Sequence, residues 1–172
     1  SKSAFIEYAE KRDLPYVVGD EKDVLGRIIK ATEAVEADVA VRVTTENPFI
    51  YEKAVDEQIK LAIERNADLV VTRNLPRGSV WEVVSARALK LSHEFGENRH
   101  RSELVTSFIT ENPRSFDIVG IEPPDVLKRP DIRLTVDNPS DLILVRKLWE
   151  SVSNNDDPYS LERIIQNYDT HN

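Results

Sequence analysis

The stretch Arg133–Pro139 reads Arg-Leu-Thr-Val-Asp-Asn-Pro, and an echo of it stands upstream at Arg42–Pro48, which reads Arg-Val-Thr-Thr-Glu-Asn-Pro. In both copies an Arg, an aliphatic residue and a Thr precede a carboxylate and an Asn-Pro pair. The β-branched residues before each carboxylate predict a strand, and the Asn-Pro pair predicts its end because proline cannot donate to a sheet ladder. The repeat therefore predicts two strands that end in similar polar residues.

The carboxylates of the repeat, Glu46 and Asp137, are expected just beyond the two strand ends. Ligands of open α/β sheets bind outside the carboxyl ends of the strands, so a shared site is one interpretation. The other interpretation is an ordinary boundary between a strand and a helix, in which Asn138 caps the helix and Pro139 occupies its first position. An Arg and a carboxylate in a buried strand are costly unless they are paired or liganded, which favours a site.

The Arg residues of the repeat are expected to lie too far from its carboxylates to neutralise them. At roughly 3.3 Å per strand residue, Arg133 stands ~13 Å from Asp137, and Arg42 stands equally far from Glu46. Two carboxylates that lie close together repel each other, which raises the pKa of at least one of them unless a cation intervenes. We therefore expect a metal ion, or a base from a neighbouring strand, to neutralise Glu46 and Asp137.

The composition is that of a globular protein, since 40% of the 172 residues are hydrophobic and 31% are charged. The length fits one domain with a sizeable core, and no apolar run approaches the length of a membrane span. A net charge of −8 argues against nucleic acid or an anionic membrane surface as the main partner. The absence of cysteine excludes disulfides and thiolate metal sites and permits an intracellular location, and we expect a cytoplasmic protein.

Hydrophobic periodicity predicts alternating helices and strands in the first half of the chain. The expected helices span residues 3–11, 23–35 and 51–65, and the expected strands span residues 15–18, 38–44 and 67–72. Such alternation is typical of right-handed crossovers and of a mostly parallel sheet. The sequence therefore predicts an α/β fold.

The alternation breaks after residue 72, where a Pro-Arg-Gly turn is expected in the loop 73–79. Beyond this loop we expect strands at 80–84 and 116–121, helices at 85–95 and 103–110, and a helix after the second copy of the repeat. Residues 1–152 are expected to form one domain, and residues 153–172 are expected to form a linker and a C-terminal docking helix.

The region 75–113 is expected to form much of a homodimer interface. It carries Trp81, Phe95 and Phe108 on elements that the main sheet does not need, and interfaces favour such aromatic residues. The alternative is that these side chains only cover one face of their own sheet.

Motifs from about Asp20 to Trp149 cover most of the chain. They are Asp23–Arg27, Arg42–Phe49, Asn74–Gly78 with Glu82–Ser85, Glu103–Ile109, and Arg133–Asp137 with Asp141–Leu142. In this order and spacing the chain resembles the cytidylyltransferase family, which includes the synthetases of CMP-KDO and CMP-sialic acid and spore-coat polysaccharide biosynthesis proteins. The resemblance implies a three-layer α/β nucleotide-diphospho-sugar transferase fold of GT-A or Rossmann-like type, and commonly a homodimer.

The resemblance also implies an activity, the transfer of CMP from CTP to a sugar acid with departure of pyrophosphate, for cell-surface polysaccharide synthesis. Mg²⁺ serves such chemistry while one or two protein carboxylates hold it and phosphates and water complete its shell. Glu46 and Asp137 match acidic positions of the family and are expected to be the metal ligands and the catalytic residues. The substrate-binding residues that the resemblance implies are Arg27, Asn47, Asn74, Glu82, Glu103 and Arg133.

The chain departs from the family pattern at several positions. Glu46 and Val80 stand where the family usually has Asp, and Ser102–Leu104 stands where it often has Arg-Glu-His. Nothing in the sequence resembles the first strand and basic phosphate-binding loop of the family, so we expect the natural protein to extend upstream of Ser1. These departures leave open a catalytically inactive domain that binds or dimerises, and the similar fold leaves open a glycosyltransferase.

Overall fold

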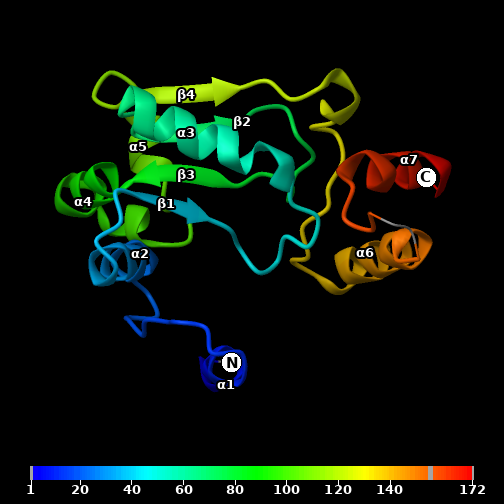
Figure 1. Cartoon of the computed structure of the whole chain (residues 1–172), viewed down its shortest axis with the longest axis horizontal. Coiled ribbons are helices and arrows are strands. Elements are labelled where there is room, and N and C mark those ends of the chain that lie inside the picture. Colours follow the sequence, from blue (N-terminus) through cyan, green and yellow to red (C-terminus); the bar gives the residue numbers. More distant parts are fainter. Residues whose placement is uncertain (1, 155–156, 172) are drawn as a thin grey trace.

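The computed structural model describes residues 2–154 and 157–171. Its described strands form one four-stranded sheet with helices on both faces, and two further helices lie beyond one end of the strands (Figure 1). The strands follow one another across the sheet as β1 (Val39–Arg42), β3 (Glu82–Ser85), β2 (Leu69–Thr72) and β4 (Ile118–Ile121). This arrangement confirms the α/β fold with three layers.

The sheet is mixed, because β3 opposes the other strands. β2 and β4 pair in parallel with Leu69 opposite Ile118, whereas β3 runs antiparallel to both β1 and β2. β1, β2 and β4 therefore point in one direction and end at the same edge. The expectation that the main sheet does not need the elements of region 75–113 is wrong, since β3 lies inside the sheet and Trp81, just before it, is only 5% exposed.

One face of the sheet is covered by α3 (Val55–Arg65), which follows the short helix η1 (Glu52–Ala54). Ala62 of this helix packs with Val70 of β2 and Val83 of β3 in a small buried cluster. Successive strand residues point to opposite faces, so the neighbours of these valines pack on the other side of the sheet.

The other face carries a larger core. The helices there are α2 (Val24–Ala34), α4 (Ala86–Phe95), η2 (Asn98–Arg101) and α5 (Ser107–Glu111). Leu25 of α2 and Leu89 of α4 pack with Leu69 and Val84 of the strands, and all four side chains are almost fully buried. The helix expected from residue 103 is shorter than predicted, because α5 begins only at Ser107.

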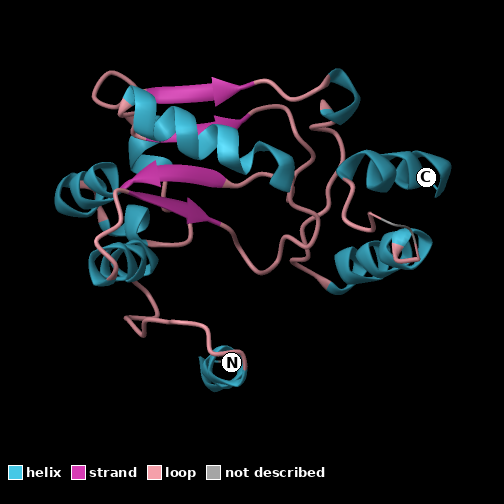
Figure 2. Ribbon diagram, in the orientation of Figure 1, coloured by secondary structure: helices cyan, strands magenta, loops and turns pink. Residues whose placement is uncertain are grey.

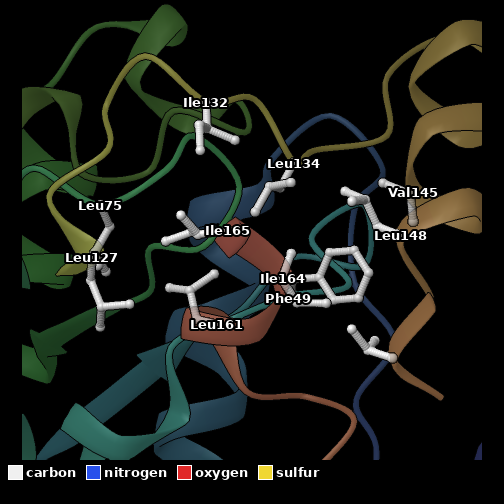
Figure 3. Packing of buried hydrophobic residues seen from close by; sticks show 11 residues of the cluster. Phe49, Leu75, Leu127, Ile132, Leu134, Val145, Leu148, Leu161, Ile164 and Ile165 are labelled. Carbon is white, nitrogen blue, oxygen red and sulfur yellow. The ribbon is translucent and has the colours of Figure 1, made fainter. Parts of the chain in front are cut away.

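Figure 2 shows the last two helices of the chain beyond the ends of β1, β2 and β4. A third hydrophobic cluster, here called the edge cluster, lies at this side of the sheet, and Figure 3 shows its side chains. It joins the loops that leave the strands to α6 (Pro139–Val152), α7 (Leu161–His171) and the short helix η3 (Asp125–Leu127). Its buried members are Phe49, Leu75, Leu127, Ile132, Leu134, Val145, Leu148, Val152, Leu161, Ile164 and Ile165. The two last helices therefore support the loops at this edge rather than the sheet itself.

The N-terminal segment stands apart from the rest of the fold (Figure 1). It consists of α1 (Lys2–Lys11) and an extended stretch on which Tyr16 remains about half exposed, as does Tyr8 on the helix. The strand predicted at residues 15–18 is wrong, because this stretch pairs with no strand that the structure describes. Strand propensity reflects fit to a pleated, half-buried surface, and among the described strands none offers this stretch such a surface through pairing.

The strand predicted in the second copy of the repeat is also wrong. There Arg133 forms only an isolated bridge with Arg77. In the first copy the predicted strand ends early, because β1 ends at Arg42 and none of residues 43–48 lies in a strand. The stretch after Arg133 is held by two different loops, because Leu134 N–H donates to the carbonyl oxygen of Arg77 and Val136 N–H donates to that of Glu46. A segment shared between two loops does not build a regular ladder.

The helix starts follow the predicted caps. The Asn138 side chain accepts hydrogen bonds from the backbone N–H groups of Ser140 and Asp141, and Pro139 occupies the first turn of α6. Ser85 likewise caps α4. Among the helices that the structure describes, none has the length and apolar character that crossing a membrane requires.

Candidate functional site

Three segments meet where β1, β2 and β4 end: the loop after β1, the loop 73–79 after β2, and the second copy of the repeat. Backbone hydrogen bonds join them, with N···O distances of 2.9 Å from Val136 to Glu46, 2.8 Å from Arg77 to Ile132 and 2.7 Å from Leu134 to Arg77. The edge cluster packs beneath these segments (Figure 3). The carboxyl edge of the sheet is therefore a surface of three interlocked loops, at the place where ligands of such sheets bind.

The structure places the two carboxylate residues of the repeat on adjoining segments. The bond from Val136 N–H to the Glu46 carbonyl oxygen brings Glu46 beside the residue that precedes Asp137. The Glu46 side chain is exposed and makes no hydrogen bond or ion pair with any residue that the structure describes. The Asp137 side chain is 50% exposed. That the two carboxylates share one metal ion stays a prediction.

The expectation that Arg133 lies too far from Asp137 is wrong. Arg133 Nη2 lies 2.5 Å from Asp137 Oδ2 and 2.9 Å from Asp141 Oδ2. The estimate assumed an extended strand and ignored the reach of the side chain, whereas this stretch is not a strand and its guanidinium spans back to both carboxylates. Asp141 and then Asp137 raise the pKa of the Arg133 guanidinium, so Arg133 stays charged.

Asp141 is the anchor of this ion-pair group. It receives hydrogen bonds from Arg133 and from the backbone N–H groups of Asp137 and Asn138. The Arg133 guanidinium, followed by the Asp137 N–H, lowers the pKa of Asp141 to about 2. The sequence analysis named Asp141 only within the motif Asp141–Leu142, although an Asp three residues after the Asn138 cap is also within reach of Arg133.

Acid is expected to loosen this edge. Because the pKa of Asp141 is lower in the folded chain than its ordinary value of about 3.9, its contribution to the free energy of unfolding is complete above that value. The contribution is lost as the pH falls from about 4 through 2. Urea midpoints measured across this range should fall less steeply in Asp141→Asn than in the parent.

The matched control for this acid titration is Asp56→Asn. Asp56 is exposed in the first turn of α3 and forms no ion pair with any described residue. This variant should keep the steeper dependence of the parent. Equal slopes for the parent and Asp141→Asn would contradict the role of Asp141.

Glu82 and Glu103 both contact Arg42, the last residue of β1. Arg42 lies directly across from Glu82 in the sheet, and its Nη1 lies 2.9 Å from Glu82 Oε2. Thr106 donates to the other oxygen of Glu82 at 2.7 Å. Arg42 Nη2 also donates to the backbone oxygen of Glu103, while the Glu103 side chain is exposed. Both oxygens of Glu82 are thus engaged within the chain, and its role toward a substrate stays a prediction.

The predicted site residues Asn47, Asn74 and Arg27 also make contacts within the chain. Asn47 donates to Thr44 Oγ1 at 2.8 Å, and Asn74, at a positive φ of 59°, donates to the Glu122 carboxylate. Both lie in loops of the carboxyl edge. Arg27 instead donates to backbone oxygens of the N-terminal segment and lines a cavity of about 420 Å³ beside α1. Its described contacts do not connect it to the repeat.

Gly78 is a structural requirement of the site that the predicted site residues did not include. Its φ of 94° lies in the region that favours glycine, and a Cβ there would lie 2.5 Å from the backbone nitrogen of Thr135. The turn can therefore approach the second copy of the repeat only because this residue has no side chain. The Pro-Arg-Gly turn signal indicated the turn but not what it touches.

The donor set suits a hard divalent cation shared with a ligand. In the described part of the chain no group of three or more His, Cys, Asp or Glu side chains could hold a metal ion. Glu46 offers a free carboxylate, and Asp137 Oδ1 has only a long contact of 3.5 Å with Thr135 Oγ1. One or two carboxylates with phosphate and water oxygens are the usual ligands of Mg²⁺. The chemical type of these two donors suits such an ion, and a shared site for it stays a prediction.

Comparison with known proteins finds a matching family and two similar proteins. A sequence model of the family described as cytidylyltransferase matches residues 16–167. An uncharacterised protein of Methanocaldococcus jannaschii is 35% identical over 146 residues, which are 85% of this chain and 60% of that protein. The spore coat polysaccharide biosynthesis protein SpsF of Bacillus subtilis is 30% identical over 147 residues, which are 85% of this chain and 61% of SpsF.

A solved structure shows the same fold. The structure of a cytidylyltransferase from Leptospira borgpetersenii matches with a TM-score of 0.84 at 21% sequence identity, and the match covers 98% of this chain and 71% of that one. The chain spans 60% and 61% of the lengths of the two curated relatives. Because the family match extends over most of the sequence, the chain belongs to the cytidylyltransferase family.

Proposed function

We propose that this chain is part of an Mg²⁺-dependent cytidylyltransferase that transfers CMP from CTP to a sugar acid and releases pyrophosphate. The observation that carries the proposal is the free Glu46 carboxylate held beside the Asp137 segment at the carboxyl edge. Membership of the family supports the reaction class. The printed name of SpsF, which refers to spore coat polysaccharide biosynthesis, supports a role in making surface polysaccharide.

The chemistry assigns a task to each group at this edge. Attack of an acceptor on the α-phosphorus of CTP requires in-line placement and neutralisation of the charge that develops on the departing pyrophosphate. Glu46 and Asp137 would hold Mg²⁺, which supplies that neutralisation when it is bound together with the phosphates. Arg133 and Asp141 orient Asp137 from behind, because they bond to its carboxylate and to its backbone N–H.

A pyrophosphate-release assay on the complete gene product tests the proposal. Release is expected only when CTP, Mg²⁺ and a sugar acid such as KDO or a sialic acid are all present. Binding of CTP without release would favour the catalytically inactive domain. Release of a nucleoside diphosphate from a nucleotide sugar, without pyrophosphate, would favour the glycosyltransferase. The absence of both binding and pyrophosphate release with all of these compounds would end the proposal.

We also propose that the chain forms a homodimer through the outer face of α4 and α5. Phe95 is 65% exposed there and lines a groove of about 250 Å³ with Leu91, Phe108 and Phe116. Light scattering at micromolar concentration should give the mass of a dimer, and Phe95→Asp should give that of a monomer. Ile63→Asp is the matched control, since Ile63 is 62% exposed on the opposite face. A monomeric parent would contradict the dimer.

A further inference from the structure

We propose that Arg77 binds an oxyanion of one of the two substrates at the carboxyl edge of the sheet. The inference rests on the proposed function and adds a binding residue to it. Arginines in a surface loop are usually solvated. The structure places it beside the ion-pair group of Arg133.

The backbone of Arg77 is held on both sides. Its N–H donates to the carbonyl oxygen of Ile132 at 2.8 Å, and its carbonyl oxygen accepts from Leu134 at 2.7 Å. The next residue, Gly78, lies so close to Thr135 that the turn cannot drift away from the second copy of the repeat. Ordering a loop costs conformational entropy. Because this loop is already ordered without a ligand, binding does not have to supply that free energy.

The side chain of Arg77 leaves the backbone beside that of Arg133. The two residues are partners in a parallel bridge, and residues opposite each other in such a bridge project from the same face. Arg133 is neutralised by Asp137 and Asp141. The Arg77 side chain is exposed and makes no hydrogen bond or ion pair with any residue that the structure describes. Its guanidinium is therefore free to bind an external anion.

Arg73 lies in the same loop, but its guanidinium occupies a different place from that of Arg77. It too is exposed and forms no ion pair with a described residue. Its guanidinium, however, lies over Gly120 of β4, in the space that a Cβ at that position would need. Arg73 therefore occupies the β2–β4 side of the loop, whereas Arg77 faces the segment that carries Asp137. The two arginines provide a matched pair for experiment.

A guanidinium binds both carboxylate and phosphate oxygens through two parallel N–H···O bonds. In the proposed reaction a carboxylate comes from the sugar acid and phosphates come from CTP. Calorimetric titration of the complete gene product separates these sources with three probes in the presence of Mg²⁺: inorganic pyrophosphate, KDO, and the methyl ester of KDO, which lacks the charge. Each probe is titrated into the parent, Arg77→Gln, Arg77→Lys and Arg73→Gln.

Arg77→Gln is expected to weaken binding of one oxyanion probe about 10- to 100-fold, the usual worth of a hydrogen bond to a charged group. If that probe is KDO, its affinity should fall to that of the ester, and the carboxylate is the source. If it is pyrophosphate, the phosphates of CTP are the source. Arg77→Lys should keep part of the affinity because lysine keeps the positive charge. The rest should be lost because lysine lacks the two parallel N–H donors of a guanidinium. Arg73→Gln should bind as the parent does.

Three results would overturn the assignment of Arg77 while the proposed function still stands. The first is unchanged binding in Arg77→Gln while the parent binds a probe, and the second is an equal loss in Arg73→Gln. The third is a parent that releases pyrophosphate from CTP but binds none of the probes. A parent that neither binds a probe nor releases pyrophosphate overturns the proposed function together with the assignment.

Discussion

Asp137→Asn is expected to lower Mg²⁺- and CTP-dependent pyrophosphate release by at least ~10³-fold in the complete gene product. The substitution removes the negative charge that would hold the metal while it keeps the size of the side chain. The fold should persist, because Arg133 keeps its contacts with Asp141 at 2.9 and 3.2 Å. The ion pair that is lost is half exposed, and such pairs contribute about 0–1 kcal/mol.

Asp125→Asn is the matched control for this loss of activity. Asp125 is an exposed carboxylate in the short helix η3, and it too is paired with a base, Lys128, at 2.8 Å. Its substitution should leave pyrophosphate release near the parent rate. The metal-ligand role of Asp137 would be untenable if Asp137→Asn kept more than about a tenth of the parent activity at saturating Mg²⁺.

Gly78→Ala is expected to lower the free energy of unfolding by roughly 2–5 kcal/mol, the sum of a left-handed backbone and an overpacked contact. The φ of 94° disfavours any side chain, and the new Cβ would lie 2.5 Å from the Thr135 nitrogen and 2.8 Å from its Cα. These neighbours are backbone atoms, so they cannot move aside as a flexible side chain does. Urea unfolding followed by circular dichroism measures the loss.

Gly19→Ala separates this effect from the general cost of replacing a glycine. Its Cβ would lie 2.6 Å from Cγ of Arg27, which is part of a flexible side chain, and Gly19 has no positive φ. A loss of less than about 1 kcal/mol is expected. If Gly78→Ala unfolded at the same urea concentration as Gly19→Ala, the close approach of the turn to Thr135 would not be a structural requirement.

The sequence predicted well those features that depend on a few neighbouring residues. The Asn138 cap of α6 and the Ser85 cap of α4 were read from residues within one helical turn, and both are present. The alternation of helices and strands was enough for the α/β fold. Such features are local because the hydrogen bonds that define them join residues three or four positions apart.

The predictions that failed depend on distant partners. Residues 15–18 have the composition of a strand but meet no sheet edge among the described residues, and the stretch after Arg133 is divided between two loops. The central position of β3 follows from pairings with residues about 15 and 40 positions away. For the site, the repeat identified Glu46 and Asp137, but no spacing rule could show that Arg133 turns back to Asp137 or that Arg77 is its neighbour.

The edge cluster has a consequence for the order in which parts of the fold open on heating. Its buried members come from loops and from η3, α6 and α7, and none comes from β1, β2, β3 or β4. Parts of a protein that share few buried contacts open as separate cooperative units, each with its own free energy. We therefore expect the loops that carry Glu46, Arg77 and Asp137 to become disordered at a lower temperature than the sheet. Heating would then disrupt the carboxyl edge in a sub-global event that is set by the packing of α6 and α7.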